Sequence, residues 1–208
     1  MEAIESVEQM EHASVNESSA EPALPSYVGY SNAHIILPIT SEQRAFARAQ
    51  LCQADILGFD TESKPVFNKG QNSEGPHLIQ LATDEYVFLF QVNADLDLNL
   101  VRDVLESKSI LKVGFGLNDD KKYLKKKLAI DTQNCIDLAR LLRESRAREM
   151  GAKGAVTKYL GLNLQKSKRI STSNWASAVL SDKQKKYAAD DASCALQIYR
   201  AHLSQTTK

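Results

Sequence analysis

Three short apolar runs constrain the fold of this chain more than any other feature. They are ILGFDTES (56–63), HLIQLATD (77–84) and YVFLFQ (86–91). Each has the length and the aliphatic and aromatic content of a strand, and the turn TDE joins the last two. A fourth such run, ILKVGFG (110–116), follows a helical pattern at 98–107. Antiparallel strands followed by strand–helix alternation predict a single α/β domain, with helices packed on a mixed sheet.

The rest of the chain supplies the expected helices and one more strand. AHIILPI (33–39) reads as a strand, and the helix after it has Thr40 or Ser41 as its N-cap. Further helices are expected at 118–129, 135–145, 155–162 and 181–203. A polar loop, 64–77, separates the first two apolar runs.

The formal charge is distributed unevenly along the chain. The whole sequence has 26 basic and 26 acidic residues, and six of the acids, all Glu, lie within residues 1–25, which contain no Lys or Arg. We therefore expect 1–25 to be a disordered acidic tail, and 26–208 to form the domain. That domain carries six more basic than acidic residues, a balance that permits a polyanionic partner.

Neither the apolar runs nor the cysteines indicate export or a membrane. No run approaches the eighteen or so apolar residues of a membrane helix, and the first residues lack a secretory signal pattern. Cys52, Cys135 and Cys194 are widely spaced and odd in number. Reduced thiols in an intracellular protein follow, with a cytoplasmic location expected, or a nuclear one in a eukaryote.

Two carboxylates stand at the end of the first apolar run. Asp60 and Glu62 are two positions apart, so on a strand they project from the same face. Like charges held that close are costly unless a cation or protons compensate them. A solvent-exposed strand end would explain the pair equally well.

A second acidic site follows the fourth run. Gly114 and Gly116 allow a sharp turn, and Asn118, Asp119 and Asp120 then occupy the first turn of a helix. Ordinary capping of the helix N-terminus accounts for such acids without any further role.

The third acidic site is the doublet Asp190–Asp191 in a helical pattern. At 100° per residue, Asp191 lies between Tyr187 and the apolar stripe, so it is expected to point inward. Asp190 lies beside the polar stripe and is expected to be solvated. That polar stripe consists of Lys186, Ser193, Gln197 and Arg200.

Three separate elements thus each offer an acid where an acid is unfavourable, and a tyrosine accompanies one of them. Oxygen ligands without histidine or paired cysteine suit Mg²⁺ or Mn²⁺ rather than zinc. Two such ions a few ångströms apart are a common device for displacement at a phosphodiester.

The order and context of these residues resemble the DEDDy 3′–5′ exonucleases, most closely the Werner syndrome exonuclease type. FDTES resembles the first family motif, and VGFGLNDDKKYL the second, whose register selects Asp120 over Asp119. YAADD resembles the third, with Tyr187 and Asp191. The likeness covers roughly residues 30–205 and includes HLIQLAT and the segment 168–192.

The resemblance implies an RNase H-like fold and a site with two divalent cations, Mg²⁺ or Mn²⁺. Asp60, Glu62 and Asp191 would hold the ion that activates water, and Asp60 would bridge to the second ion. Asp120 would hold that ion mainly through water, and Tyr187 would orient the attacking water. The implied reaction releases nucleoside 5′-monophosphates from nucleic-acid 3′ ends.

The sequence leaves alternatives for the substrate and for whether the domain is catalytically active. Relatives of the ribonuclease D type usually add helical domains after the third motif, which this sequence lacks, so DNA is favoured over RNA. An RNA-trimming, ribonuclease D-like enzyme and a catalytically inactive nucleic-acid-binding domain are the alternatives. The intact set of four acids and a tyrosine favours an enzyme.

Two departures from the family pattern are Ser63-Lys64, where relatives often carry an aromatic, and a longer ISTSNW (170–175).

Candidate nucleic-acid contacts lie beside these motifs. Lys121, Lys122 and Lys125 belong to a lysine run directly after Asp120, which is either a rim that tracks phosphates or a solvated helix face. Arg143 lies in a second basic patch that also includes Arg140, Arg146 and Arg148. Phe115, Phe67 and His77 are candidates for stacking on a terminal base, although aromatics more often pack in the core. Trp175 is expected to be a packing anchor.

Overall fold

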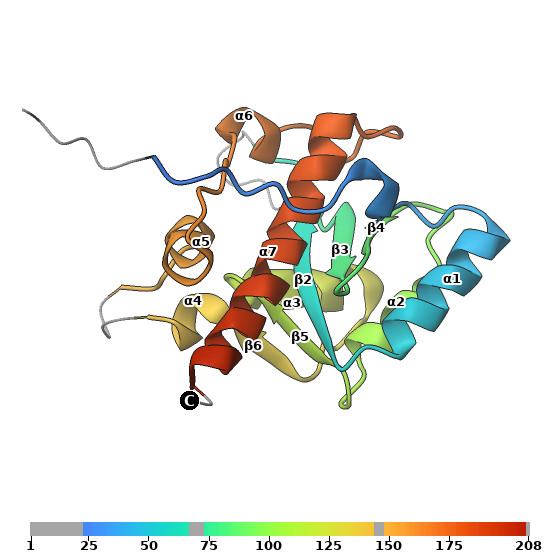
Figure 1. Ribbon diagram of the computed structural model, residues 1–208. Helices are drawn as coiled ribbons and strands as arrows, with labels where there is room; N and C mark the ends of the chain where they lie inside the picture. Colours follow the sequence, from blue (N-terminus) through green and yellow to red (C-terminus); the bar gives the residue numbers. More distant parts are fainter. Residues whose placement is uncertain (1–22, 67–72, 144–147, 207–208) are drawn as a thin grey trace, which may run out of the picture.

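The computed structural model describes residues 23–66, 73–143 and 148–206, and its centre is a six-stranded mixed sheet (Figure 1). The strand order is β1-β4-β3-β2-β5-β6. Strand β3 is antiparallel to both of its neighbours, and the other pairs are parallel. The strands are β1 Ile35–Ile36, β2 Ile56–Glu62, β3 Leu78–Ala82, β4 Val87–Gln91, β5 Leu111–Gly114 and β6 Cys135–Asp137. The predicted single α/β domain is confirmed.

Helices connect and cover these strands. They are α1 Ser41–Cys52, α2 Leu98–Leu105, α3 Leu117–Leu128, α4 Leu138–Leu141, α5 Ala152–Leu160, α6 Lys168–Ser171 and α7 Asp182–Thr206, with a 3₁₀ turn at Asn32–His34. Thr40 is the N-cap of α1, and its side chain accepts from the Gln43 amide. Apart from the one at 135–145, the helices expected from the sequence are confirmed, with ends that differ by up to three residues.

Two expected elements differ from the sequence prediction, and the short helix α6 was not predicted. The helix expected at 135–145 is present only as α4, which ends at Leu141, and the first three residues of the expected range pair with β5 as strand β6. Asp137 ends that strand and caps α4, because its carboxylate accepts from the amide of Ala139. The strand expected at 33–39 is only two residues long, since a 3₁₀ turn precedes it and Pro38, which has no amide donor, follows it.

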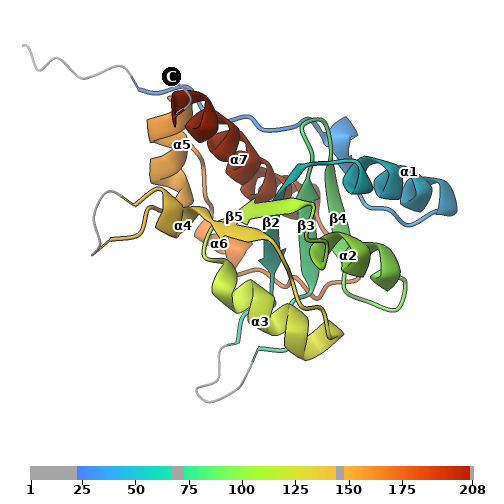
Figure 2. The same cartoon turned by 90° about the horizontal axis from the view of Figure 1, so that it is seen from below.

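Helices lie on both faces of the sheet (Figure 2). Residues of α1, α2 and α3 pack against Leu57, Phe59 and Ile79 on one face. On the other face, α7 packs against β3 and β4, and against α5 and α4. Trp175 is fully buried in this second layer, and its Nε1 donates to the carbonyl of Ser171 at 3.1 Å, so its expected packing role is confirmed.

The backbone of helix α7 packs directly against the backbone of the central strand β2. A Cβ atom at Gly58 would clash with the carbonyl oxygen of Ala192, so only glycine fits there. Alanines at 188, 189 and 192 form the inner surface of the helix at this level. The small side chains bring the middle of α7 directly over the end of β2.

The segment that precedes β1 covers another side of α7, and Figure 1 shows it crossing this helix. The hydroxyl groups of Tyr27 and Ser193 lie 3.0 Å apart, and the Lys186 ammonium group donates to the carbonyl of Val28. Pro25 is already held, because its carbonyl accepts from the Asn163 amide at 2.8 Å. Residues 1–22, most of the expected tail, lie outside the described residues.

This segment corrects the prediction for the polar stripe of α7. Ser193 is fully buried rather than solvated, and Asp190 is half-buried beside Gly29 and paired with Lys186. The helical phase placed both residues away from the sheet, and a distant part of the chain covers them. In the described part of the chain, no helix combines the length and apolarity needed to cross a membrane.

A buried lysine fastens the end of α2 to β5. Lys112 has no exposed surface, and its ammonium group donates to the carbonyls of Ser107 at 2.7 Å, Ile110 at 2.8 Å and Val104 at 3.3 Å. Burial lowers the pKa of Lys112 to about 8. Three acceptors match the three donors of an ammonium group, so the side chain closes the turn that follows α2.

We predict that Lys112→Met lowers the free energy of unfolding by about 3 kcal/mol, because three buried carbonyls lose their donor. Chemical denaturation measures this change. The exposed neighbour Lys108 is the matched control, and Lys108→Met should change the free energy by no more than about 0.5 kcal/mol. Equal effects of the two variants would contradict the role given to Lys112.

Candidate active site

The end of the central strand β2 carries the first two carboxylates. Asp60 and Glu62 share one face of β2 with Gly58, the residue against which α7 packs. Both side chains are partly exposed, and Asp60 accepts from the amide of Thr61 at 2.9 Å. The shared face predicted from their spacing is thus the face covered by α7.

Helix α7 brings the third carboxylate to this strand end. Asp191 is 7% exposed, so the inward orientation predicted from the helical phase is confirmed. Its Oδ1 lies 2.9 Å from the ammonium group of Lys166. Tyr187, one turn earlier on α7, is half-buried, and its ring packs 6.1 Å from that of Trp175.

The first turn of α3 supplies the fourth carboxylate. Asp120 accepts a hydrogen bond from the Thr61 hydroxyl, which lies between Asp60 and Glu62 on β2. Asp119, by contrast, is exposed. Of the two acids left open by the helix pattern, Asp120 is therefore the one directed to the strand end.

The acids at this strand end influence one another electrostatically. Burial, followed by the charges of Asp120, Asp191 and Glu62, raises the pKa of Asp60 well above its ordinary value. Burial and Asp191 raise the pKa of Glu62 to about 8, and burial raises that of Asp120 to about 6. The site thus has an excess of negative charge that protons or cations must compensate.

Lys166 is the cation at this site that sequence analysis missed. Burial lowers its pKa, but the carboxylates of Asp191 and Asp60 outweigh this and raise it above the ordinary value. The ammonium group also lies 5.9 Å from the centre of the Tyr187 ring. Lys166 stands in the connection between α5 and α6, where no periodic pattern could have marked it.

The donor set suits hard divalent cations, although the side chains do not yet form a closed set of ligands. Among the described residues, no three His, Cys, Asp or Glu side chains are gathered closely enough to hold an ion as they stand. Lys166 pairs with Asp191, and Thr61 holds Asp120. The four carboxylates and their uncompensated charge nevertheless fit Mg²⁺ or Mn²⁺, once Lys166 and Thr61 release their partners.

The candidate nucleic-acid contacts lie around this cluster or away from it. Lys121, Lys122 and Lys125 are exposed on α3 beyond Asp120, and Lys125 pairs with Asp131 at 3.1 Å. Arg143 is exposed after α4. Phe115 is partly buried against the apolar cluster of α5 and α7. Phe67 and Arg146 lie outside the described residues.

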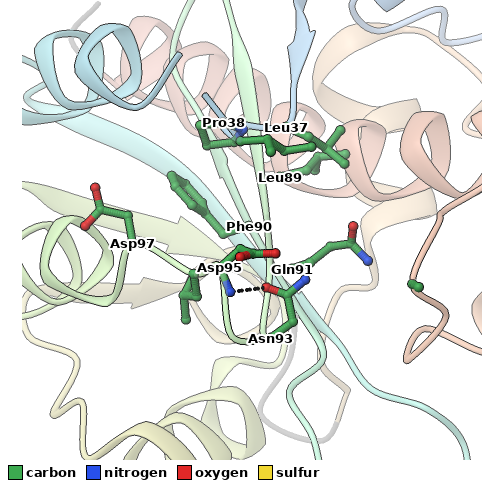
Figure 3. Close-up of a pocket in the computed structure, with 11 residues that line it drawn as sticks. Leu37, Pro38, Leu89, Phe90, Gln91, Asn93, Asp95 and Asp97 are labelled. Atoms are coloured by element: carbon green, nitrogen blue, oxygen red, sulfur yellow. Dashed lines mark hydrogen bonds between the residues drawn. The ribbon is translucent and has the colours of Figure 1, made fainter. Parts of the chain in front are cut away.

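The pocket drawn in Figure 3 lies apart from the carboxylate cluster. It has a volume of about 150 Å³ and is lined by Leu37, Pro38, Leu89 and Phe90, with Asp95 and Asp97 at its edge. These residues belong to β1, β4 and the segments next to them, and none of the four clustered carboxylates lines the pocket. The carboxylate cluster at the end of β2 is therefore the candidate active site.

We predict that Lys166→Gln strengthens Mn²⁺ binding about tenfold, because the ammonium group competes with the ion for Asp191 and repels it. In chelator, the same variant should lose about 2 kcal/mol of unfolding free energy, a figure discounted for the partial exposure of Lys166. Calorimetric titration and thermal unfolding measure the two effects. Lys168→Gln, on an exposed lysine two residues away, is the control. Weaker Mn²⁺ binding by Lys166→Gln would contradict the competition.

The chain also matches proteins of known function over most of its described length. The family described as 3′-5′ exonuclease matches residues 34–205. The bifunctional 3′-5′ exonuclease/ATP-dependent helicase WRN of Mus musculus is 30% identical over 154 residues, which cover 73% of this chain and 11% of that protein. The chain thus spans about a tenth of the length of this relative.

Solved structures share the fold. The Nibbler EXO domain of Aedes aegypti aligns with a TM-score of 0.71 and 27% identity, over 85% of this chain and 90% of that one. The RNase D of Trypanosoma brucei in complex with RNA U12 aligns with a TM-score of 0.67 and 21% identity, over 80% and 61%, a likeness of fold alone. On the family match, the mouse relative and the arrangement of its acids, the chain belongs to the 3′–5′ exonuclease family.

Proposed function

We propose that this domain shortens nucleic acids from free 3′ ends by hydrolysing the terminal phosphodiester with the help of two divalent cations, Mg²⁺ or Mn²⁺. Nucleoside 5′-monophosphates are the products. The observation that carries the proposal is the meeting of four carboxylates from three elements at the end of β2, beside a tyrosine. Membership of the exonuclease family supports it.

The carboxylates divide between the two ions. Asp60, Glu62 and Asp191 would hold one, and Asp60 with Asp120 would hold the other. When bound, the cations lower the pKa of water and neutralise charge that develops on the phosphate. Their positive charge also compensates the acids that burial and mutual repulsion otherwise keep protonated.

Tyr187 supplies a hydrogen bond rather than a base. Burial, and then the charge of Asp191, raises its pKa to about 12, so the phenol keeps its proton at neutral pH. A protonated phenol can donate to or accept from a water molecule and so orient it. It cannot remove a proton from that water, so its role is to orient the nucleophile. Because water is the nucleophile, the proposed reaction needs no covalent intermediate with the protein.

The surface around the site would guide the strand. Lys121 and Lys122 are exposed on the helix that begins with Asp120, and their place suits contact with phosphates upstream of the scissile bond. Lys125 and Arg143 would extend this basic surface. Phe115 remains a candidate for stacking on a base through its exposed part.

DNA is the first candidate substrate, because the three motifs most resemble the Werner type of exonuclease. RNA is the second, and one observation favours it: the Trypanosoma brucei RNase D that shares this fold is known in complex with RNA U12. Both polymers present the same 3′-terminal phosphodiester to the carboxylates. Discrimination between them would depend on contacts with the 2′-hydroxyl group.

We predict 3′-to-5′ shortening of single strands in Mg²⁺ or Mn²⁺. Matched DNA and RNA strands with a free or blocked 3′ end, and with a free or blocked 5′ end, should be compared by gel and by chromatography of the products. A 3′ block or a chelator should stop the reaction, and a 5′ block should leave it unchanged. Shortening that persists in chelator, or that only a 5′ block prevents, would contradict the mechanism.

Adjacent acids of α7 provide a matched pair for the site. Asp191→Asn should lower kcat on the order of 10³-fold, because it removes a charge at the reacting phosphate. Asp190→Asn should keep activity within about threefold, and should cost no more than about 1 kcal/mol of stability through its pair with Lys186. Initial rates and thermal unfolding measure both, and equal loss of activity would refute the assignment.

A further inference from the structure

A glutamine in the middle of the sheet lacks the partners that its polar atoms require. Gln80, the central residue of β3, has no exposed surface. Among the described residues, neither its Oε1 nor its Nε2 has a hydrogen-bond partner. Native proteins rarely leave both atoms of a buried amide unpaired, because each has lost its hydrogen bonds to water. The position therefore needs a reason that packing alone does not give.

The register places this amide beside the carboxylate cluster. Gln80 stands directly opposite Asp60 in the antiparallel pair of β3 and β2. Side chains opposed in this way lie on the same face of the sheet, with Cβ atoms about 5 Å apart. On its other side, Gln80 stands opposite Leu89 of β4, which offers no polar atom. Asp60 is thus the polar side chain directly across the strand from this amide.

Helix α7 closes the space above Gln80. Leu78 and Ala82 share the face of β3 on which Gln80 lies, and they pack with Ala188 and Ala192 of α7. The amide is therefore enclosed between the sheet and the helix that carries Asp191. A leucine or methionine would fill this space without leaving polar atoms unpaired.

We propose that Gln80 is a positioning residue for the metal-loaded site, whose amide Nε2 donates to the carboxylate of Asp60. The inference rests on the proposed function, because Asp60 would be shared by both ions. Carboxylates that bind metals usually have a hydrogen-bond donor on their other lone pairs, and this donor fixes their orientation. An amide suits the task better than lysine or arginine, because it donates without a positive charge that would repel the ions.

This role predicts two changes of opposite sign for Gln80→Met, which keeps the length of the side chain and removes both polar atoms. In chelator, the melting temperature should rise by about 3 °C, because an unsatisfied amide is gone. The dissociation constant for Mn²⁺, measured by calorimetric titration, should rise about 10- to 100-fold, because Asp60 loses its orienting donor. Gln80→Leu repeats the test with a stiffer side chain.

The control is the same substitution elsewhere in the sheet. Gln91 on β4 is partly exposed and donates to the carbonyl of Ser177 at 3.0 Å, so Gln91→Met should leave the Mn²⁺ constant unchanged. An unchanged Mn²⁺ constant in both Gln80 variants would overturn the inference. A melting temperature in chelator that falls in both would also overturn it, because the amide would then serve the metal-free fold.

The wild-type protein separates this inference from the proposed function. If it binds no Mn²⁺ and does not shorten strands, the proposed function fails, and the inference fails with it. If it binds Mn²⁺ and cleaves, but the Gln80 variants bind the ion equally well, the inference alone fails.

Discussion

The close packing of α7 on β2 is the contact on which the site depends. Because Gly58 has no side chain, the carbonyl of Ala192 packs directly against the strand. The small alanine side chains of α7 allow the helix to lie this close to the sheet. Asp191 precedes Ala192 and Asp60 follows Gly58 by two residues, so the contact that closes the core also sets one acid of the candidate site near another. Core packing and the geometry of the site are therefore one constraint rather than two.

The cluster that results is electrostatically unfavourable as it stands. Burial and mutual repulsion raise the pKa values of Asp60 and Glu62, and Lys166 compensates only part of the charge. A chain selected for stability alone would not bring four acids from three elements to one strand end. The arrangement is understandable if the site, as proposed, gives up stability in the metal-free state and binds divalent cations.

The sequence predicted the parts of this structure whose cause is local. Apolar runs marked β2 to β5, the capping pattern placed α1, and the helical phase separated Asp191 from Asp190. The sequence did not predict the environment of side chains that contact distant segments. Ser193 is buried by residues near Tyr27, and Lys166 reaches Asp191 from an irregular connection. The glutamine of HLIQLAT lies in a correctly predicted strand, but only the pairing of β3 with β2 shows that it faces Asp60.

Helix α7 is held between the sheet and the segment near Tyr27, and this arrangement limits how early the site can fold during synthesis. Asp60 is synthesised about 130 residues before Asp191, and the early segment that holds α7 is synthesised before either. Until α7 has left the ribosome, this face of β2 has no helix packed against it, and the segment near Tyr27 lacks its packing partner. A nascent chain therefore carries the acids of β2 and α3 without Asp191 or Tyr187. The candidate active site can form only on a chain that has been translated as far as α7.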